Sequence, residues 1–180
     1  MSTQVTISKK TIRKIAAAIA AVNNSREVGG LFMGYRHSSK YRIVDATVPD
    51  CEKCSGVASF VLDGAEETAK AEALAGRYTN TPEIIGVWHS HIWGDAVFSL
   101  QDEESNRRLA QILGNCLSAL ALPEKQSNLR KLMIWEIDRR ARQKSAEPPV
   151  KRRIYHDRGA MQQLRILAIQ KMCCDSANPK

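Results

Sequence analysis

The sequence predicts a mixed α/β or α+β fold organised as one domain. Its 180 residues suit a single domain with one sizeable hydrophobic core. The hydrophobic fraction of 43% and the charged fraction of 26% are ordinary for a soluble globular protein. Short strand-like segments alternate irregularly with segments of helical periodicity, which favours this class over regular βα repeats. No internal repeat or second domain is indicated, so we expect residues 1–180 to form a single unit.

The first predicted helix spans residues 8–22. Ser8 can cap its N-terminus, and apolar residues follow at helical spacing. These residues are Ile12, Ile15, Ile19 and Val22. Two strands are predicted next. One covers residues 28–35, where glycines allow another backbone to approach closely, and the other covers residues 41–48, where apolar and polar residues alternate.

The middle of the chain continues with a short strand at residues 60–62 and an Ala- and Glu-rich helix over residues 65–78. The next strand, residues 84–91, is nearly all apolar up to Trp88, which is typical of a strand at the centre of a sheet. The remaining predicted elements are a helix over residues 99–113, strands over residues 116–122 and 130–137, and a C-terminal helix over about 161–172.

The formal net charge of the chain is +8, which favours acidic partners, with nucleic acid as one candidate. Much of this charge falls at about residues 139–153. That segment also contains Pro148 and Pro149, so it is predicted to be a basic loop. The loop has two interpretations: a solvated surface segment, or a contact surface for an acidic partner.

The beginning of the chain, MSTQVTISKK, shows no apolar stretch of the secretory type. The apolar run at residues 15–22 is too short to span a bilayer. With five cysteines, an odd number, these features predict a cytoplasmic protein with reduced thiols and no membrane contact. Cys51 and Cys54 have the spacing of a metal or redox pair, but the adjacent Cys173 and Cys174 are poor partners for a four-ligand site.

The segment from His89 to Asp102 carries the clearest chemical signal. His89 and His91 end the apolar strand, and residues two apart in a strand point to the same face, about 6.5–7 Å apart. Two imidazoles in this arrangement can bind one cation. Gly94 and Asp95 allow a turn, after which the next helix can present Asp102. Two histidines and one carboxylate suit catalytic zinc, which keeps a fourth position for water.

Each part of this set also has a structural interpretation. A His-x-His pair alone is weak evidence for a metal site. Ser99 and Asp102 have the spacing of a capping box, with Ser99 as the N-cap and an acidic residue at N3. The two interpretations are compatible, because a helix N-terminus beside a metal can hold both a carboxylate ligand and a serine hydroxyl. By its position alone, Glu27 would be an ordinary solvated carboxylate.

The spacing His-Ser-His, seven residues, Ser, two residues, Asp, with Glu27 beside the Gly-rich segment at residues 28–34, resembles the JAMM motif of the JAB/MPN metallopeptidases. The resemblance covers roughly residues 8–137 and follows the family's order of elements. It implies a single MPN/JAB-like (cytidine-deaminase-like) domain with a mixed central β-sheet flanked by helices. The weaker matches are residues 93–95, where many members carry proline, and the basic tail after residue 138.

The resemblance implies a role for each residue of the motif. His89, His91 and Asp102 bind Zn²⁺, and water is the fourth ligand. Glu27 is the general base that accepts a proton from this water and returns it to the leaving amine. Ser99 stabilises the oxyanion of the tetrahedral intermediate.

Peptidases of this family often cut after the Gly-Gly tail of ubiquitin or a ubiquitin-like protein. A narrow cleft with sheet-edge pairing suits such a tail, and Trp93 is a candidate for lining it. The short chain resembles prokaryotic members, some of which sit in antiphage operons beside ubiquitin-activating-like and conjugating-like enzymes. The expectation is a zinc isopeptidase that processes a ubiquitin-like protein or its conjugate. Two alternatives stay open: a non-catalytic MPN scaffold and a nucleic-acid-associated JAB-like protein.

Overall fold

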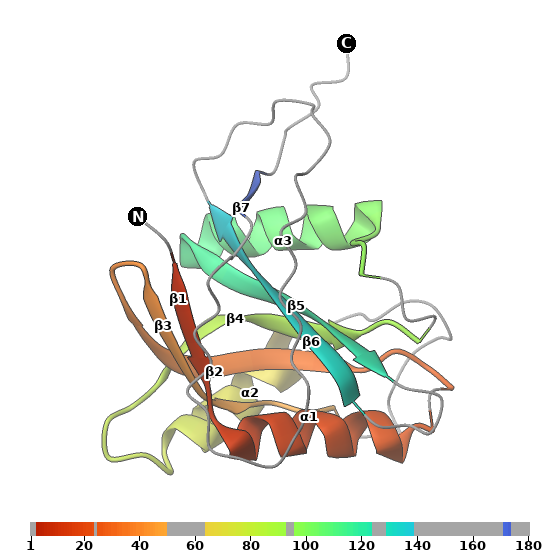
Figure 1. The fold of residues 1–180 in the computed structure, drawn as a ribbon. Helices are drawn as coiled ribbons and strands as arrows, with labels where there is room; N and C mark the ends of the chain where they lie inside the picture. Colours follow the sequence, from red (N-terminus) through yellow and green to blue (C-terminus); the bar gives the residue numbers. More distant parts are fainter. Residues whose placement is uncertain are drawn as a thin grey trace.

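The structure, a computed structural model, describes most of the first 138 residues and one short segment near the C-terminus. The described residues are 3–23, 25–49, 64–92, 96–123, 129–138 and 171–173. They form a seven-stranded mixed sheet with the strand order β1-β3-β2-β4-β5-β6-β7. In this part of the chain three helices flank the sheet (Figure 1). The predicted fold class, with its mixed central sheet, is therefore confirmed.

Eight of the ten predicted elements agree with observed ones to within a few residues at each end. The strands are β1 (Gln4–Ile7), β2 (Gly29–His37), β3 (Lys40–Ala46), β4 (Glu83–Ser90), β5 (Cys116–Pro123), β6 (Leu129–Asp138) and β7 (Lys171–Cys173). The helices are α1 (Lys9–Ala21), α2 (Gly64–Ala75) and α3 (Leu100–Leu113). All three helices, and the strands β2 to β6, were predicted from the sequence.

Strands β1 and β7 are the elements that the sequence did not predict. The predicted C-terminal helix at about 161–172 is wrong at Lys171 and Met172, which lie in β7 and pair in parallel with β6. Neighbouring strands supply the backbone partners of these short segments, and local sequence does not reveal such partners. Residues 161–170 lie outside the described residues, as do the predicted strand at residues 60–62 and the basic loop at 139–153.

Helix α1 begins at the predicted cap, Ser8, whose side chain also forms a hydrogen bond with the sheet. The side chain of Ser8 accepts the N–H of Thr11 at 3.0 Å and donates to the carbonyl of Val44 at 3.1 Å. The first contact satisfies an N–H group that has no partner within the helix. Ile15 and Ile19 are buried in the core cluster of the sheet, so the apolar stripe of the helix faces β3.

Helix α1 covers one face of the sheet, and α2 and α3 cover the other. Phe32 and Trp88 pack in the core cluster on the α1 side, whereas their chain neighbours Leu31 and Val87 pack against α2. Helix α3 lies on β4, β5 and β6. Because successive side chains of a strand point to opposite faces, the face shared by α2 and α3 is the one to which Val87 and His89 point.

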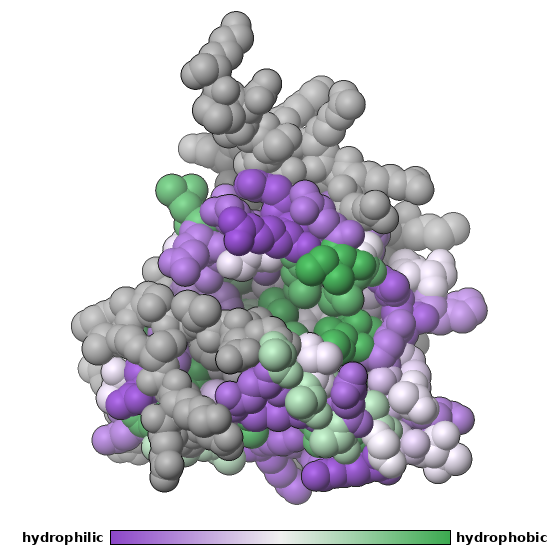
Figure 2. Space-filling model, turned by 180° about the vertical axis from the view of Figure 1, so that it is seen from behind, coloured by the Kyte–Doolittle hydropathy of each residue, from purple (hydrophilic) through white to green (hydrophobic). Residues whose placement is uncertain are grey.

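The side of the molecule that carries α3 is largely hydrophilic where this helix meets solvent (Figure 2). Among the described residues, three large apolar side chains are nevertheless exposed. Val97 and Leu100 lie at the start of α3, and the third is Ile112. None of the described helices combines the length and the apolar character needed to cross a membrane.

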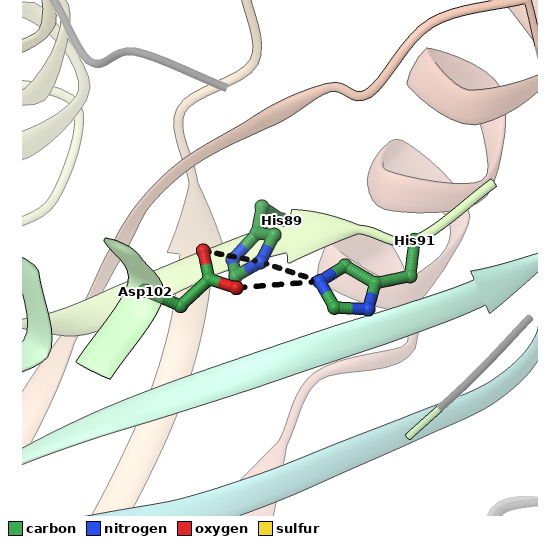
Figure 3. Close-up of side chains that lie close together, drawn as sticks. All are labelled: His89, His91 and Asp102. Atoms are coloured by element: carbon green, nitrogen blue, oxygen red, sulfur yellow. Dashed lines mark hydrogen bonds and ion pairs between the residues drawn. The ribbon is translucent and has the colours of Figure 1, made fainter. Parts of the chain in front are cut away.

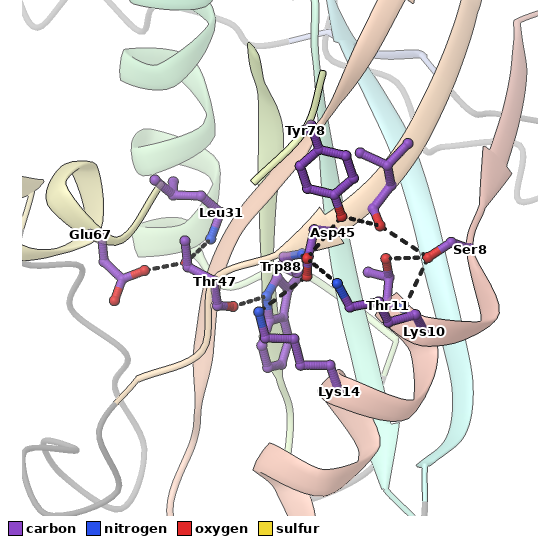
Figure 4. Close-up of polar contacts among 12 residues, drawn as sticks. Ser8, Lys10, Thr11, Lys14, Leu31, Asp45, Thr47, Glu67, Tyr78 and Trp88 are labelled. Atoms are coloured by element: carbon purple, nitrogen blue, oxygen red, sulfur yellow. Dashed lines mark hydrogen bonds and ion pairs between the residues drawn. The ribbon is translucent and has the colours of Figure 1, made fainter. Parts of the chain in front are cut away.

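Asp45 on β3 connects two helical regions to the sheet (Figure 4). Its buried carboxylate accepts hydrogen bonds from Lys10 at 2.9 Å and Lys14 at 3.1 Å on α1, and from the hydroxyl of Tyr78 at 3.0 Å after α2. Burial by itself would raise the pKa of Asp45. The hydrogen bonds from Lys10, from the backbone N–H of Ala46 and from Lys14 outweigh this effect and lower the pKa to about 2.

We predict that acid destabilises the fold as Asp45 becomes protonated. Because its folded-state pKa lies below the ordinary value of 3.8, the stabilisation is complete above about pH 4 and is lost as the pH falls through about 2. The loss amounts to roughly 2 kcal/mol of unfolding free energy. Urea unfolding between about pH 2 and 6 measures this loss.

Asp45→Asn should remove this pH dependence, whereas Glu72→Gln, a control at an exposed carboxyl on α2, should keep it. An Asp45→Asn protein with wild-type pH dependence would contradict the assignment.

Three glycines lie where neighbouring strands come too close for a side chain. A Cβ atom on Gly86 would overlap the carbonyl of Leu117 on β5, one on Gly30 would overlap the carbonyl of Thr47, and one on Gly34 would overlap Arg42 on β3. The glycines of the predicted strand at residues 28–35 therefore do allow the close backbone approach expected of them.

Gly86→Ala is expected to lower the unfolding free energy by about 1–3 kcal/mol, because the obstacle is backbone of a central strand that cannot move aside. Gly76→Ala is the matched control, since its Cβ atom would meet nothing closer than the carbonyl of Glu72 at 3.7 Å. Its effect should stay within about 0.5 kcal/mol. Equal stability of the two variants in urea unfolding would rule out the steric explanation.

Candidate metal centre

His89 and His91 lie at the end of β4, a strand held from both sides. On one side β2 runs antiparallel to it, with Gly29 opposite His89. On the other side β5 runs parallel, and the amide of His91 donates to the carbonyl of Ala121 at 3.1 Å. Both histidines are buried. As predicted from their spacing, their rings point to one face, the face that α2 and α3 cover.

Asp102 reaches the histidines from the first turn of α3. Ser99 caps this helix and forms the predicted capping box with Asp102. The hydroxyl of Ser99 accepts the N–H of Asp102 at 3.2 Å, and the backbone N–H of Ser99 donates to Oδ2 of Asp102 at 2.8 Å. The hydroxyl also donates to the same Oδ2 at 2.7 Å. The capping box thus fixes the rotamer of the carboxylate that faces the imidazoles.

The ligand atoms of these three residues face one another (Figure 3). Nε2 of His89 lies 3.1 Å from Nε2 of His91 and 3.2 Å from Oδ1 of Asp102. Nε2 of His91 lies 3.5 Å from Oδ2 of Asp102. Tetrahedral zinc with ligand bonds of about 2.0–2.1 Å needs ligand atoms roughly 3.3 Å apart. The distance between the two imidazole nitrogens is close to this value, and one ligand atom from each of the three residues lies within 4.8 Å of the other two. The three residues could therefore hold this ion.

The electrostatics of the cluster favour an ionised carboxylate. Burial would raise the pKa of Asp102, but hydrogen bonds with His89 and His91, and a further one with Ser99, hold it well below its usual range. Asp102 is consequently an anion at neutral pH, which is the form required of a metal ligand. One anion and two neutral imidazoles leave a bound divalent ion with a net charge of about +1, so it stays an effective Lewis acid.

An aromatic pair supports the cluster from the α3 side. Phe98 is buried and directly precedes the cap of α3. Its ring centroid lies 6.1 Å from that of His89 and 4.7 Å from that of Trp135 on β6. This packing holds the start of α3 against the imidazole of His89. The sequence analysis did not identify Phe98 or Trp135; the available signal was an aromatic residue immediately before a predicted cap.

Glu27 lies just before β2, beside the strand that carries the ligands. The N–H of Ser90 donates to the carbonyl of Val28 at 2.7 Å, so the antiparallel contact of β2 with β4 continues past the first residue of β2. Glu27 directly precedes Val28, whose partner Ser90 stands between the two histidines. A residue 62 positions away from the first ligand in sequence is thereby brought to the end of β4 that carries the histidines.

The remaining predicted site residues fall into two groups. Ser99 is exposed and belongs to the cluster through its hydrogen bonds with Asp102. Trp93, proposed to line the substrate cleft, lies outside the described residues, and so do Cys51 and Cys54.

We predict that the purified protein binds one zinc ion per chain. His89→Ala and Asp102→Ala should each weaken zinc binding by more than about 100-fold, because each removes one of three ligands. His37→Ala is the control, since His37 is an exposed histidine at the far end of β2. Isothermal titration of the metal-free proteins and elemental analysis measure the effect. Unchanged binding in Asp102→Ala would show that the ion is held elsewhere.

Comparisons with known proteins agree with this fold. Among solved structures, the solution structure of a protein from Desulfitobacterium hafniense matches with a TM-score of 0.51 and 20% identity, covering 72% of this chain and 83% of that one. At this identity the match concerns the fold alone. No curated protein matches the sequence. The model of a family described as prokaryotic homologs of the JAB domain matches residues 8–145, and because this is most of the 180 residues, the chain belongs to that family.

Proposed function

We propose that this protein is a zinc-dependent isopeptidase or peptidase that hydrolyses the bond after the C-terminal glycine of a ubiquitin-like protein. The observation that carries the proposal is the convergence of His89, His91 and Asp102, whose facing atoms lie 3.1, 3.2 and 3.5 Å apart. Further support comes from the family, because JAB domains include zinc isopeptidases. In this proposal the three residues hold the zinc ion.

Glu27 is the proposed general base. When bound, zinc supplies a Lewis acid that polarises the scissile carbonyl and makes water nucleophilic at neutral pH. Glu27 accepts the proton of the attacking water and passes it to the nitrogen of the leaving amine. Its place in the chain, directly before Val28 and outside the three ligands, suits a carboxylate that moves protons without binding the metal.

Ser99 is the proposed donor to the oxyanion. Its hydroxyl donates to Oδ2 of Asp102 at 2.7 Å, and its backbone N–H holds the same oxygen at 2.8 Å. The backbone contact can keep the carboxylate in place when the hydroxyl turns toward the developing negative charge. A donor of this kind stabilises a transition state by about 3 kcal/mol.

The proposed substrate is a ubiquitin-like protein or its conjugate. A tail that ends in glycines has no side chains there, so it can reach a narrow site as an extended strand and pair through its backbone. We extend the proposal to partners of the same operon, namely ubiquitin-activating-like and conjugating-like enzymes, and to a role in bacterial antiphage defence. Cleavage in the cytoplasm would be consistent with such partners.

The test is cleavage of a ubiquitin-like protein extended beyond its terminal glycine, through a peptide bond in one substrate and a lysine isopeptide bond in another. Zinc-loaded wild-type protein should cleave at least one of them. Glu27→Gln should lower kcat by roughly 10²–10⁴-fold while it keeps zinc, whereas Asp102→Ala should lose both zinc and activity. Glu72→Gln, distant on α2, is the control with wild-type activity.

Ser99 needs a variant that separates catalysis from helix capping. Ser99→Ala removes the hydroxyl and the cap together and should lower kcat by roughly 10²–10³-fold. Ser99→Thr keeps both groups and should retain most of the activity. A zinc-loaded wild-type protein that cleaves neither substrate would instead favour a non-catalytic role, and normal cleavage by Glu27→Gln would refute the proposed base.

A further inference from the structure

Ser90 is the residue between the two histidines, and the proposed mechanism gives it no role. It is 1% exposed. Because strand side chains alternate between faces, its side chain does not share the direction of the His89 and His91 rings. Its hydroxyl instead accepts a hydrogen bond from the backbone N–H of Val28 at 3.0 Å. Val28 is itself fully buried, so this N–H cannot turn to solvent.

The contact replaces a normal ladder bond at the end of the pairing between β2 and β4. In a regular antiparallel pair the N–H of Val28 would donate to the carbonyl of Ser90, as the N–H of Ser90 does to the carbonyl of Val28 at 2.7 Å. Here the side-chain oxygen is the acceptor. On its other edge β4 keeps its pairing with β5, where the amide of His91 donates to the carbonyl of Ala121. The hydroxyl of Ser90 therefore supplies the last acceptor of the β2–β4 ladder.

The peptide group so held is the one that joins Glu27 to Val28. Its N–H is fixed by the hydroxyl of Ser90, and the next carbonyl is fixed by the N–H of Ser90. With both peptide groups around Val28 bonded to Ser90, the peptide that follows Glu27 is held to the strand that carries the histidines. The restraint acts on the residue proposed as general base, without a contact to its carboxylate.

We propose that Ser90 is a positioning residue, whose hydroxyl sets the place of Glu27 relative to the metal ligands through the Glu27–Val28 peptide. The inference rests on the proposed function, since it assigns Glu27 the catalytic role described above. A misplacement of about 1 Å in a catalytic group can cost roughly 100-fold in rate. The hydroxyl therefore contributes to catalysis while it touches neither metal nor substrate.

Two variants and one matched control separate positioning from general stability. Ser90→Ala removes the acceptor, and Ser90→Thr keeps a hydroxyl at the same place. Ser118→Ala is the control, because Ser118 is also fully buried, lies on the neighbouring strand β5, and its hydroxyl has no hydrogen-bond partner among the described residues. All three proteins are compared with wild type for urea stability and zinc content before activity is measured.

Hydrogen exchange of the Val28 amide reports the contact without any dependence on activity. In Ser90→Ala this buried donor loses its acceptor, and its exchange should become about tenfold faster or more. The amide should exchange at nearly the wild-type rate in Ser90→Thr and in Ser118→Ala. Unchanged exchange in Ser90→Ala would overturn the inference.

Catalysis provides the second readout. In zinc-loaded Ser90→Ala, kcat for the extended ubiquitin-like substrate should fall by about 10–100-fold, with zinc content and KM close to wild type, and Ser90→Thr should restore it. Equal loss in Ser118→Ala, or loss of zinc from Ser90→Ala, would mean a structural role and would overturn the inference. An inactive wild-type protein that carries zinc would count against the proposed function, while the exchange of Val28 would still decide whether Ser90 holds this peptide.

Discussion

The place of β4 at the centre of the sheet is the constraint on which the rest of the site depends. Backbone hydrogen bonds to β2 on one side and β5 on the other hold this strand, and helices cover both of its faces. Strand alternation then directs His89 and His91 to one face with little freedom to move. Pairing with β2 brings Glu27 to the same end. A site built on such an element is held more rigidly than a site built on loops.

Asp102, in the first turn of α3, has two functions. Asp102 completes the cap of its own helix and presents a carboxylate to both imidazoles. The hydrogen bonds that orient this carboxylate also keep its pKa low. The protein itself therefore keeps Asp102 charged, oriented and partly desolvated, as a metal ligand needs to be. Phe98 fixes the approach of the helix by packing against His89 and Trp135. Fold membership alone does not assign chemistry; this geometry is what supports a zinc hydrolase.

Much of the fold could be predicted because its signals are local. Helical periodicity and a capping serine identify α1, and the apolar run before His89 identifies a central strand. Strands β1 and β7 gave no such signal. Each is short, and each is stabilised by parallel pairing with a distant strand, β1 with β3 and β7 with β6. Propensity within four or three residues is too weak to indicate that pairing.

The candidate site could likewise be predicted only where its signals are local. The sequence by itself determined the histidine pair and the capping box, because both depend on spacing within one strand or one helical turn. Only the tertiary structure decided that Asp102 meets both imidazoles, that the segment of Glu27 and Val28 lies at the end of β4 that carries them, and that the hydroxyl of Ser90 holds an amide 62 positions away. These contacts depend on which strands become neighbours and on where they separate. That choice follows from the packing of the whole sheet, which no local pattern specifies.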